Sequence, residues 1–214
     1  MLNEIREDDR LQLFERGFVI LQNFLPEDTV QRLTFEVVRL CAQEDTGDST
    51  RRDIVFLTDV ERRSDYIFDT ARSPRLVDFI CSLMDTRAVP MNVELFVKPP
   101  RSAFVTPIHQ DHAFYKKPFE RAALTIWIAL DDATGESGAL QYAEGRWSIT
   151  LPHKRSQVDY FSLEIEGASE LNFRLAEVQR GGCVVHHSFA VHRSGPNVTD
   201  APRRALAFTY RAAS

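Results

Sequence analysis

The second half of the chain contains the stretch Ala123-Leu124-Thr125-Ile126-Trp127-Ile128-Ala129-Leu130. Large apolar residues occupy every second position, which is the pattern of a strand that packs one face against a core. The same two-residue period recurs in 92–97 and 205–210, and an apolar run follows Gly181-Gly182. Short strands separated by Gly, Pro and Asp turns are typical of antiparallel sandwiches and barrels. We therefore expect a mainly β fold.

The N-terminal part repeats apolar residues with helical spacing instead. A short helix is expected to end at Arg16, and the apolar run 18–21 predicts a buried strand. Pro26 predicts a helix from about Glu27, and Ser73-Pro74 predicts a second one with Ser73 as its N-cap. Helices gathered at the N-terminus would pack on one sheet.

Length and composition limit the possible classes. The chain has 214 residues, 43% hydrophobic and 27% charged, with no repeat or linker, so residues 1–214 are expected to form a single domain. Its net charge of −5 disfavours nucleic acid as the main partner. No apolar run is long enough for a membrane span, and the polar start MLNEIREDDR resembles neither a signal nor a transit peptide. Three widely spaced cysteines favour a cytoplasmic protein with reduced thiols. The oligomeric state stays open.

The segment Pro107-Ile108-His109-Gln110-Asp111-His112 carries the strongest chemical signal. On an extended backbone His109 and Asp111 face the same side, and Gln110 faces away. An imidazole and a carboxylate on one face offer two ligands to a divalent metal. A distant histidine would complete the 2-His-1-carboxylate triad of non-haem Fe(II) oxygenases. Periodicity leaves three candidates for it: His186, His187 and His192.

Several motifs in order resemble the phytanoyl-CoA dioxygenase family of Fe(II)/2-oxoglutarate oxygenases. They are Gly17-Phe18-Val19-Ile20-Leu21 through Phe24-Leu25-Pro26, Lys98-Pro99-Pro100 with His109-Gln110-Asp111, Trp127-Ile128-Ala129-Leu130-Asp131-Asp132, Ser137-Gly138-Ala139-Leu140, and His192-Arg193-Ser194-Gly195-Pro196-Asn197 with Arg203. The resemblance covers most of the chain. It implies a double-stranded β-helix, or jelly roll, with iron between the two sheets.

The resemblance also implies roles for particular residues. His109, Asp111 and His192 would be the metal ligands and catalytic centre. Arg203, eleven residues after His192, would bind the far carboxylate of 2-oxoglutarate, and a planar guanidinium suits this role. Arg204 is the rival, but it shares a strand face with Leu206, Phe208 and Tyr210, which look packed against helices. Ser194 and Trp127 would line the cosubstrate pocket.

The implied cofactors are Fe(II), 2-oxoglutarate as cosubstrate, and O2. The expected reaction oxidises a small organic molecule and releases succinate and CO2. Because related halogenases lack the carboxylate of the triad, Asp111 favours hydroxylation or another oxidative step. Family breadth suggests secondary metabolism and not the acyl-CoA substrate of the family name.

Two alternatives remain. The first is a jelly-roll metalloenzyme that does not use 2-oxoglutarate, and the second is a non-catalytic binding module. Among other residues, Glu94 is predicted to point into the barrel, where it could bind a cationic or hydroxylated substrate. Phe114, Tyr115 and Trp147 could form an apolar wall, and residues 152–172 are expected to be an irregular loop that could serve as a lid.

Overall fold

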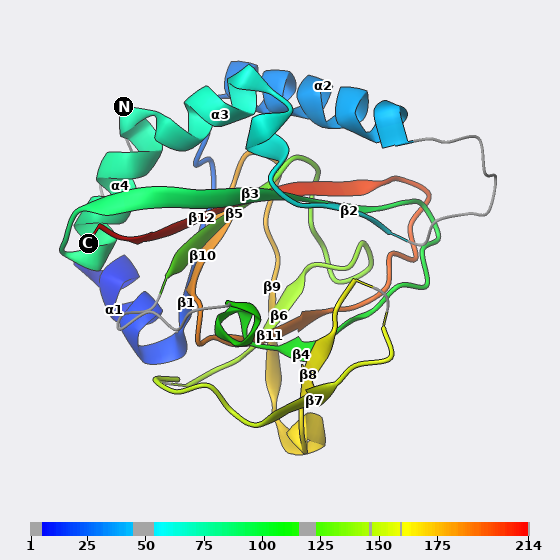
Figure 1. Cartoon of the computed structure of the whole chain (residues 1–214). Helices are drawn as coiled ribbons and strands as arrows, with labels where there is room; N and C mark the ends of the chain where they lie inside the picture. The colour runs from blue at the N-terminus through cyan, green and yellow to red at the C-terminus, as the bar shows by residue number, and fades with distance from the viewer. Residues whose placement is uncertain (1–5, 45–53, 116–122, 146, 159, 214) are drawn as a thin grey trace.

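The computed structural model describes residues 6–44, 54–115, 123–145, 147–158 and 160–213. Within these residues two antiparallel sheets lie face to face, as the strand pattern predicted (Figure 1). The six-stranded sheet has the order β1 (Phe18–Leu21), β10 (Cys183–His187), β5 (Leu124–Ala129), β12 (Arg203–Ala212), β3 (Ala88–Lys98) and β2 (Val55–Leu57). The four-stranded sheet has the order β4 (Thr106–His109), β11 (Val191–Ser194), β6 (Leu140–Ala143) and β9 (Phe173–Ala176).

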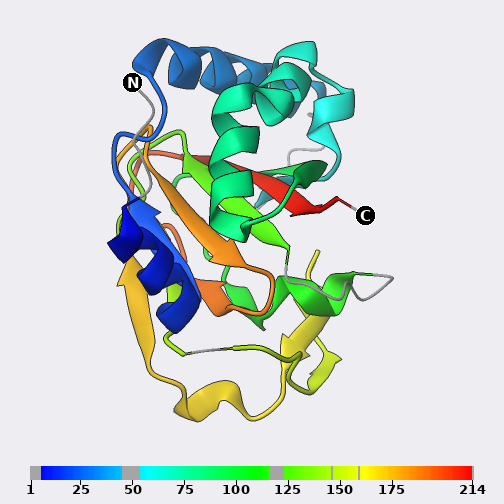
Figure 2. The same cartoon turned by 90° about the vertical axis from the view of Figure 1, so that its left-hand side faces the viewer.

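The helices α2 (Glu27–Glu44), α3 (Asp65–Arg72) and α4 (Pro74–Met84) lie over the outer face of the six-stranded sheet, and α1 (Glu7–Arg16) lies beside β1 (Figures 1 and 2). Every second residue of β3 and β12 faces the helices, and the apolar residues at these positions pack with helical side chains in one buried cluster. At its edge the hydroxyl of Tyr210 donates to the carbonyl of Ala71 on α3 at 2.8 Å. The prediction that N-terminal helices cover one sheet is confirmed.

The inner face of the same sheet has a different composition. Ala129, Ala205 and Ala207 lie on it beside Trp127 and form part of a second buried cluster with residues of the four-stranded sheet. Because alternate residues of a strand face opposite sides, β12 supplies large residues to the helix side and small ones to the interior. Small side chains leave space between the sheets for a cavity.

Two expectations about local structure are corrected. Residues 152–172 contain a hairpin of β7 (His153–Arg155) and β8 (Leu163–Ile165), followed by the 3-10 turn η3 (Ala168–Glu170), where we expected an irregular loop. Helix α3 was not predicted, because its eight residues give few turns from which to recognise a period. Ser73 does precede α4, but its hydroxyl donates to the carbonyl of Thr70 and does not cap the helix.

In the part of the chain that the structure describes, no helix has both the length and the apolar character to cross a bilayer.

The turn before β6 gives a testable prediction. Gly138 has φ +81°, and a Cβ placed on it would lie 2.7 Å from the carbonyl oxygen of Gly195, just beyond β11. Gly138→Ala is expected to lower the free energy of unfolding by about 2–4 kcal/mol. The cost of a left-handed backbone at alanine and the cost of the clash with the Gly195 carbonyl both contribute to this loss. Gly167→Ala is the control, with φ +66° but nothing within 4 Å, and should cost about 1 kcal/mol. Urea denaturation measures both; equal losses would contradict the clash.

Candidate active site

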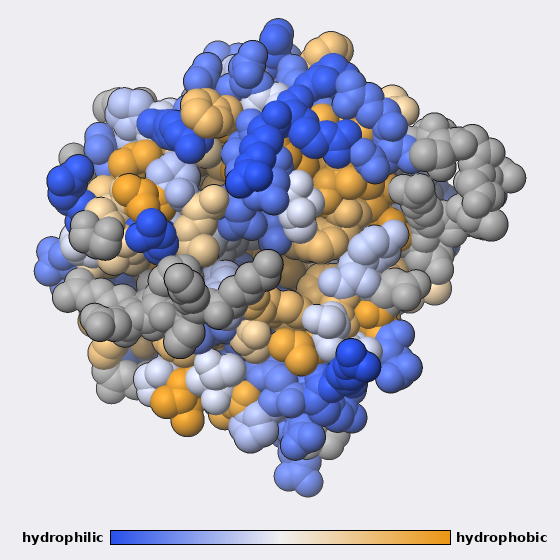
Figure 3. Space-filling view, viewed as in Figure 1, coloured by the Kyte–Doolittle hydropathy of each residue, from blue (hydrophilic) through white to orange (hydrophobic). Residues whose placement is uncertain are grey.

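A cavity of about 270 Å³ lies between the two sheets. Figure 3 shows apolar surface bordering a hollow near the middle of the molecule. All six residues singled out from the sequence line this cavity: His109, Asp111, Trp127, His192, Ser194 and Arg203. The fold thus gathers into one space residues that are up to 94 positions apart in the chain.

Two histidines lie opposite each other on neighbouring strands. His109 at the end of β4 pairs with His192 on β11, and their ring centroids are 4.1 Å apart. The Nδ1 of His109 bonds to the carbonyl of Pro107 at 2.8 Å, and the Nδ1 of His192 bonds to the carbonyl of Ala190 at 3.0 Å. A carbonyl only accepts, so each Nδ1 carries a proton, and in the neutral ring Nε2 then keeps its lone pair. This is the tautomer that binds a metal through Nε2.

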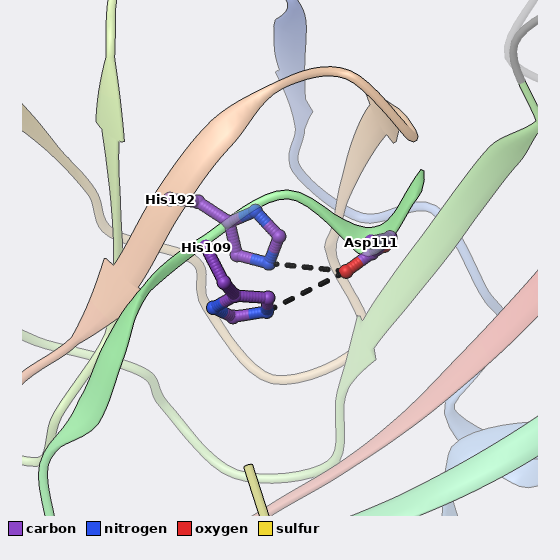
Figure 4. A group of neighbouring side chains, drawn as sticks. All are labelled: His109, Asp111 and His192. Atoms are coloured by element: carbon purple, nitrogen blue, oxygen red, sulfur yellow. Dashed lines mark ion pairs between the residues drawn. The ribbon is translucent and has the colours of Figure 1, made fainter. Parts of the chain in front are cut away.

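Asp111 completes the group at the start of the 3-10 turn η2 (Asp111–Phe114). Its Oδ1 lies 3.5 Å from Nε2 of both His109 and His192, and the three side chains point toward one another (Figure 4). One ligand atom from each residue can be chosen so that all lie within 4.8 Å of one another. Burial alone would raise the pKa of Asp111, but His192, His109 and His186 hold it well below its usual range. Burial is the main cause that lowers the pKa of His192 to about 3, and the nearby His109 ring is the second cause.

These protonation states leave unprotonated nitrogens facing an ionised carboxylate. Lone pairs that converge in this way, with no proton between them, need a cation. The donor set of two imidazoles and one carboxylate matches a facial triad with open positions.

Gln110 explains why the two ligands in this segment face the same side. Its backbone is extended, and its fully buried side chain turns away from the cavity. The amide nitrogen donates to the carbonyls of Ile149 and Phe189 at 3.0 and 2.7 Å, and its oxygen accepts from the backbone of Leu151 at 2.7 Å. Gln110 therefore fixes the backbone between His109 and Asp111. Sequence reasoning had given it no role beyond facing away.

The three histidines that periodicity could not separate have different surroundings. His192 faces His109 and Asp111 across the cavity. His186 on β10 contacts the other oxygen of Asp111, with its Nε2 3.1 Å from Oδ2. His187 lies on the opposite face of β10, beside Gly17 and Leu13. Only tertiary contacts distinguish these roles.

Arg203 is the only arginine or lysine among the described residues that line the cavity. It is 2% exposed, and its buried Nε and Nη1 have no hydrogen-bond partner. Burial lowers the pKa of Arg203 to about 10, so the guanidinium remains charged at neutral pH. A buried cation without a partner is costly, and an anionic ligand would offset that cost.

The rival Arg204 has a partner of its own. Its side chain forms two bonds to the carboxylate of Asp131, at 2.7 and 2.6 Å, and it does not line the cavity. The unpartnered guanidinium is therefore that of Arg203.

Ser194 and Trp127 lie on the same walls as Arg203. The guanidinium carbon of Arg203 lies 5.3 Å from the centre of the Trp127 ring, a cation–π contact. The hydroxyl of Ser194 lies 2.8 Å from that of Thr106, and both are buried. This end of the cavity thus combines a cation with hydroxyls.

Lys98, of the motif Lys98-Pro99-Pro100, is not exposed to solvent. Its side chain is completely buried, outside the cavity lining, and its Nζ donates to the carbonyls of Phe104 and Gly195. Burial, with Arg203 nearby, lowers the pKa of Lys98 to about 6. Lys98 therefore ties β3 to the turn after β11 and is largely uncharged at neutral pH.

The opposite end of the cavity is also polar. Asn92, Thr209, Thr125 and His186 occupy paired positions across four neighbouring strands and form a polar row. The hydroxyls of Thr125 and Thr209 lie 3.1 Å apart. Glu94 lies beside this row on β3 and lines the cavity, as predicted. Burial, then Asp111, raises its pKa to about 8.

Aromatic side chains form the walls between these polar ends. Phe114 and Tyr115 line the cavity, as does Phe161 of the β7–β8 hairpin. The expectation for Trp147 is wrong, since its indole donates to the carbonyl of Ala143 and the residue is not part of the lining. The hairpin that replaced the expected loop thus contributes to the cavity wall.

Comparison with known proteins decides the family. The profile described as Phytanoyl-CoA dioxygenase (PhyH) matches residues 14–205, most of the chain. The chain belongs to the phytanoyl-CoA dioxygenase family. This is a family of non-haem Fe(II)/2-oxoglutarate dioxygenases, which confirms the resemblance found in the motifs. Peroxisomal phytanoyl-CoA dioxygenase of Rattus norvegicus is 24% identical over 92% of this chain and 65% of its own length. The chain therefore spans less than two thirds of that relative.

Two solved structures are also similar to this chain. EvdO2 from Micromonospora carbonacea var. aurantiaca, complexed with 2-oxoglutarate, is 28% identical and superposes with a TM-score of 0.84 over 100% of this chain and 93% of that one. The epimerase SnoN, in complex with Fe3+, α-ketoglutarate and nogalamycin RO, is 22% identical with a TM-score of 0.82 over 97% of this chain and 83% of that one. At that identity SnoN supports the shared fold alone. The jelly-roll architecture is therefore established.

The raised pKa of Glu94 predicts a pH dependence. The group ionises near pH 4.5 when unfolded but at about 8 when folded, so the unfolded chain loses this proton first. The contribution of Glu94 to the free energy of unfolding should therefore fall as pH rises from about 5 to 8. Glu94→Gln removes this contribution. Denaturation of metal-free protein at several pH values should show the stability of the wild type falling relative to that of the variant over this range, and parallel profiles would contradict the prediction.

Proposed function

We propose that this chain is an Fe(II)/2-oxoglutarate-dependent oxygenase that oxidises a small organic molecule and releases succinate and CO2. One observation carries the proposal: the unpartnered guanidinium of Arg203 lies in the same cavity as the converging ligand atoms of His109, Asp111 and His192. A metal triad alone would suit many enzymes. A buried cation in the same cavity adds a site for an anionic cosubstrate.

The metal would be held by Nε2 of His109, Nε2 of His192 and the carboxylate of Asp111. Both imidazole Nδ1 atoms already donate to backbone carbonyls, which orients the rings before a metal binds. When bound, Fe(II) and 2-oxoglutarate would supply O2 activation coupled to oxidative decarboxylation of the cosubstrate.

Arg203 would bind the far carboxylate of 2-oxoglutarate through its two free donors. Ser194 would add a hydroxyl, and Trp127 would hold the guanidinium plane by the contact described above. Ala205 and Ala207 on the same strand face leave room for the molecule. Phe161 at the cavity wall would help to exclude water from the reacting centre.

The substrate would be small, because a cavity of about 270 Å³ must hold it together with the cosubstrate. We infer an apolar molecule with a hydroxyl or amino group, since aromatic walls lead to Glu94 and the polar row. We also propose a role in secondary metabolism, as the breadth of the family suggests. We place the enzyme in the cytoplasm, since Cys41, Cys81 and Cys183 are free thiols.

The cosubstrate assignment is tested by anaerobic titration with Fe(II) and then 2-oxoglutarate. The wild type should develop the weak visible charge-transfer band of a chelated 2-oxoacid. Arg203→Ala should weaken 2-oxoglutarate binding by about 30-fold or more, as expected when a buried charged partner is removed. Arg204→Ala is the matched control and should keep the band, because Arg204 pairs with Asp131 outside the cavity. Iron binding without a band would favour the metalloenzyme that does not use 2-oxoglutarate, and binding of neither would favour the non-catalytic module.

The triad is tested separately by Asp111→Ala. The variant should lose Fe(II) binding and all succinate release, since only two ligands remain. Asp131→Asn, which changes a carboxylate outside the cavity, should retain both. Isothermal titration measures the first property and chromatographic succinate detection the second; full succinate release by Asp111→Ala would refute the ligand assignment.

A further inference from the structure

The two oxygens of Asp111 have different neighbours. Oδ1 faces the Nε2 atoms of His109 and His192 at 3.5 Å each. Oδ2 instead forms a hydrogen bond with Nε2 of His186 at 3.1 Å. The carboxylate could in principle bind a metal through one oxygen or both. A hydrogen-bond partner on Oδ2 favours binding of the metal through Oδ1 alone.

The direction of each hydrogen bond follows from the chemistry of the groups. An ionised carboxylate only accepts, so Nε2 of His186 carries a proton. On a neutral ring Nδ1 then accepts, and the hydroxyl of Tyr142 lies 2.8 Å from it. A phenol keeps its proton at neutral pH, so the hydroxyl of Tyr142 can donate to this nitrogen. The result is a directed relay, in which Tyr142 donates to His186 and His186 donates to Asp111.

The tautomer of His186 is opposite to that of the two proposed ligands. His109 and His192 donate from Nδ1 to backbone carbonyls and leave Nε2 free. His186 donates from Nε2 and accepts at Nδ1. The hydrogen-bond network therefore distinguishes two rings suited to bind a metal from a third that acts on the carboxylate.

The relay is held rigidly by both sheets. His186 lies on β10 of the six-stranded sheet, between Phe18 on β1 and Thr125 on β5. Tyr142 lies on β6 of the four-stranded sheet, is fully buried, and stacks on Phe18 with ring centroids 4.2 Å apart. Asp111, in contrast, belongs to a short 3-10 turn that follows a strand end. The hydrogen bond from His186 therefore holds the carboxylate of Asp111 from outside its own short turn.

We propose that His186, oriented by Tyr142, is a positioning residue that occupies Oδ2 of Asp111 and presents Oδ1 to the metal. The inference rests on the proposed triad. It assigns a function to His186, one of the three histidines that periodicity left undecided. Binding through one oxygen would keep further coordination positions open for the cosubstrate and O2.

The test compares four variants with the wild type. His186→Leu removes the donor, His186→Gln retains an amide that can donate to Asp111, and Tyr142→Phe removes only the hydroxyl that orients His186. His187→Leu is the matched control, because His187 follows on the same strand but faces away from the cavity. Anaerobic calorimetry measures Fe(II) affinity, and absorption spectroscopy measures the charge-transfer band with 2-oxoglutarate. Thermal unfolding of the metal-free proteins reports on folding.

His186→Leu should weaken Fe(II) binding by about 10–100-fold and shift the band, as is usual when a group supporting a metal ligand is lost. His186→Gln should recover part of the affinity, and Tyr142→Phe should weaken it by about 3–10-fold. His187→Leu should change the unfolding temperature but neither the affinity nor the band. This pattern would support the proposal.

Unchanged affinity and band in His186→Leu would overturn it. Equal losses in His186→Leu and His187→Leu would also overturn it, since the effect would then be merely structural. Because Tyr142→Phe keeps the shape of the side chain, its result decides the case even if His186→Leu folds poorly. Failure of the wild type to bind Fe(II) would instead refute the proposed function itself, so the two failures are distinguishable.

Discussion

Asp111 places an ionised carboxylate among three imidazole rings in the interior between two sheets, where charge is costly unless it is paired. Much of the surrounding structure supports this arrangement. β4 and β11 bring His109 opposite His192, Gln110 fixes the chain between the first two ligands, and His186 binds the remaining oxygen. The electrostatics agree with this geometry, because the histidines keep Asp111 ionised and burial keeps His192 neutral.

The second constraint is the different use of the two faces of one sheet. Outward-facing residues of β3 and β12 bury large apolar side chains against the helices, which stabilises the fold. Inward-facing residues of the same strands surround the cavity and, apart from Phe96, are small or polar. Arg203 lies at one end and Glu94 with the polar row lies toward the other, so a single strand pairing separates the proposed cosubstrate and substrate regions. Alternation of side chains along a strand thus separates the groups that stabilise the fold from those that serve the proposed chemistry.

The cavity also explains how a widespread fold can act on different molecules. Its proposed metal and cosubstrate groups come from strands of the two sheets, which hold them rigidly. The aromatic wall comes partly from the β7–β8 hairpin and from Phe114 and Tyr115 at the end of η2, which can vary without disturbing the strands. Family membership therefore restricts the chemistry more tightly than it restricts the substrate.

Local patterns in the sequence were sufficient for strands β1, β3, β5, β10 and β12, for helices α1, α2 and α4, and for placing His109 and Asp111 on the same side. These features depend on residues within a few positions, where periodicity and turn chemistry act directly. The resemblance added His192 and Arg203, and strand alternation correctly separated Arg203 from Arg204. Periodicity did not distinguish His186 from His192, and only the tertiary structure showed that the two rings face different oxygens of Asp111. Likewise, the burial of Lys98, the anchoring of Gln110 and the hairpin in 152–172 depend on contacts with segments distant in the chain, which no local pattern records.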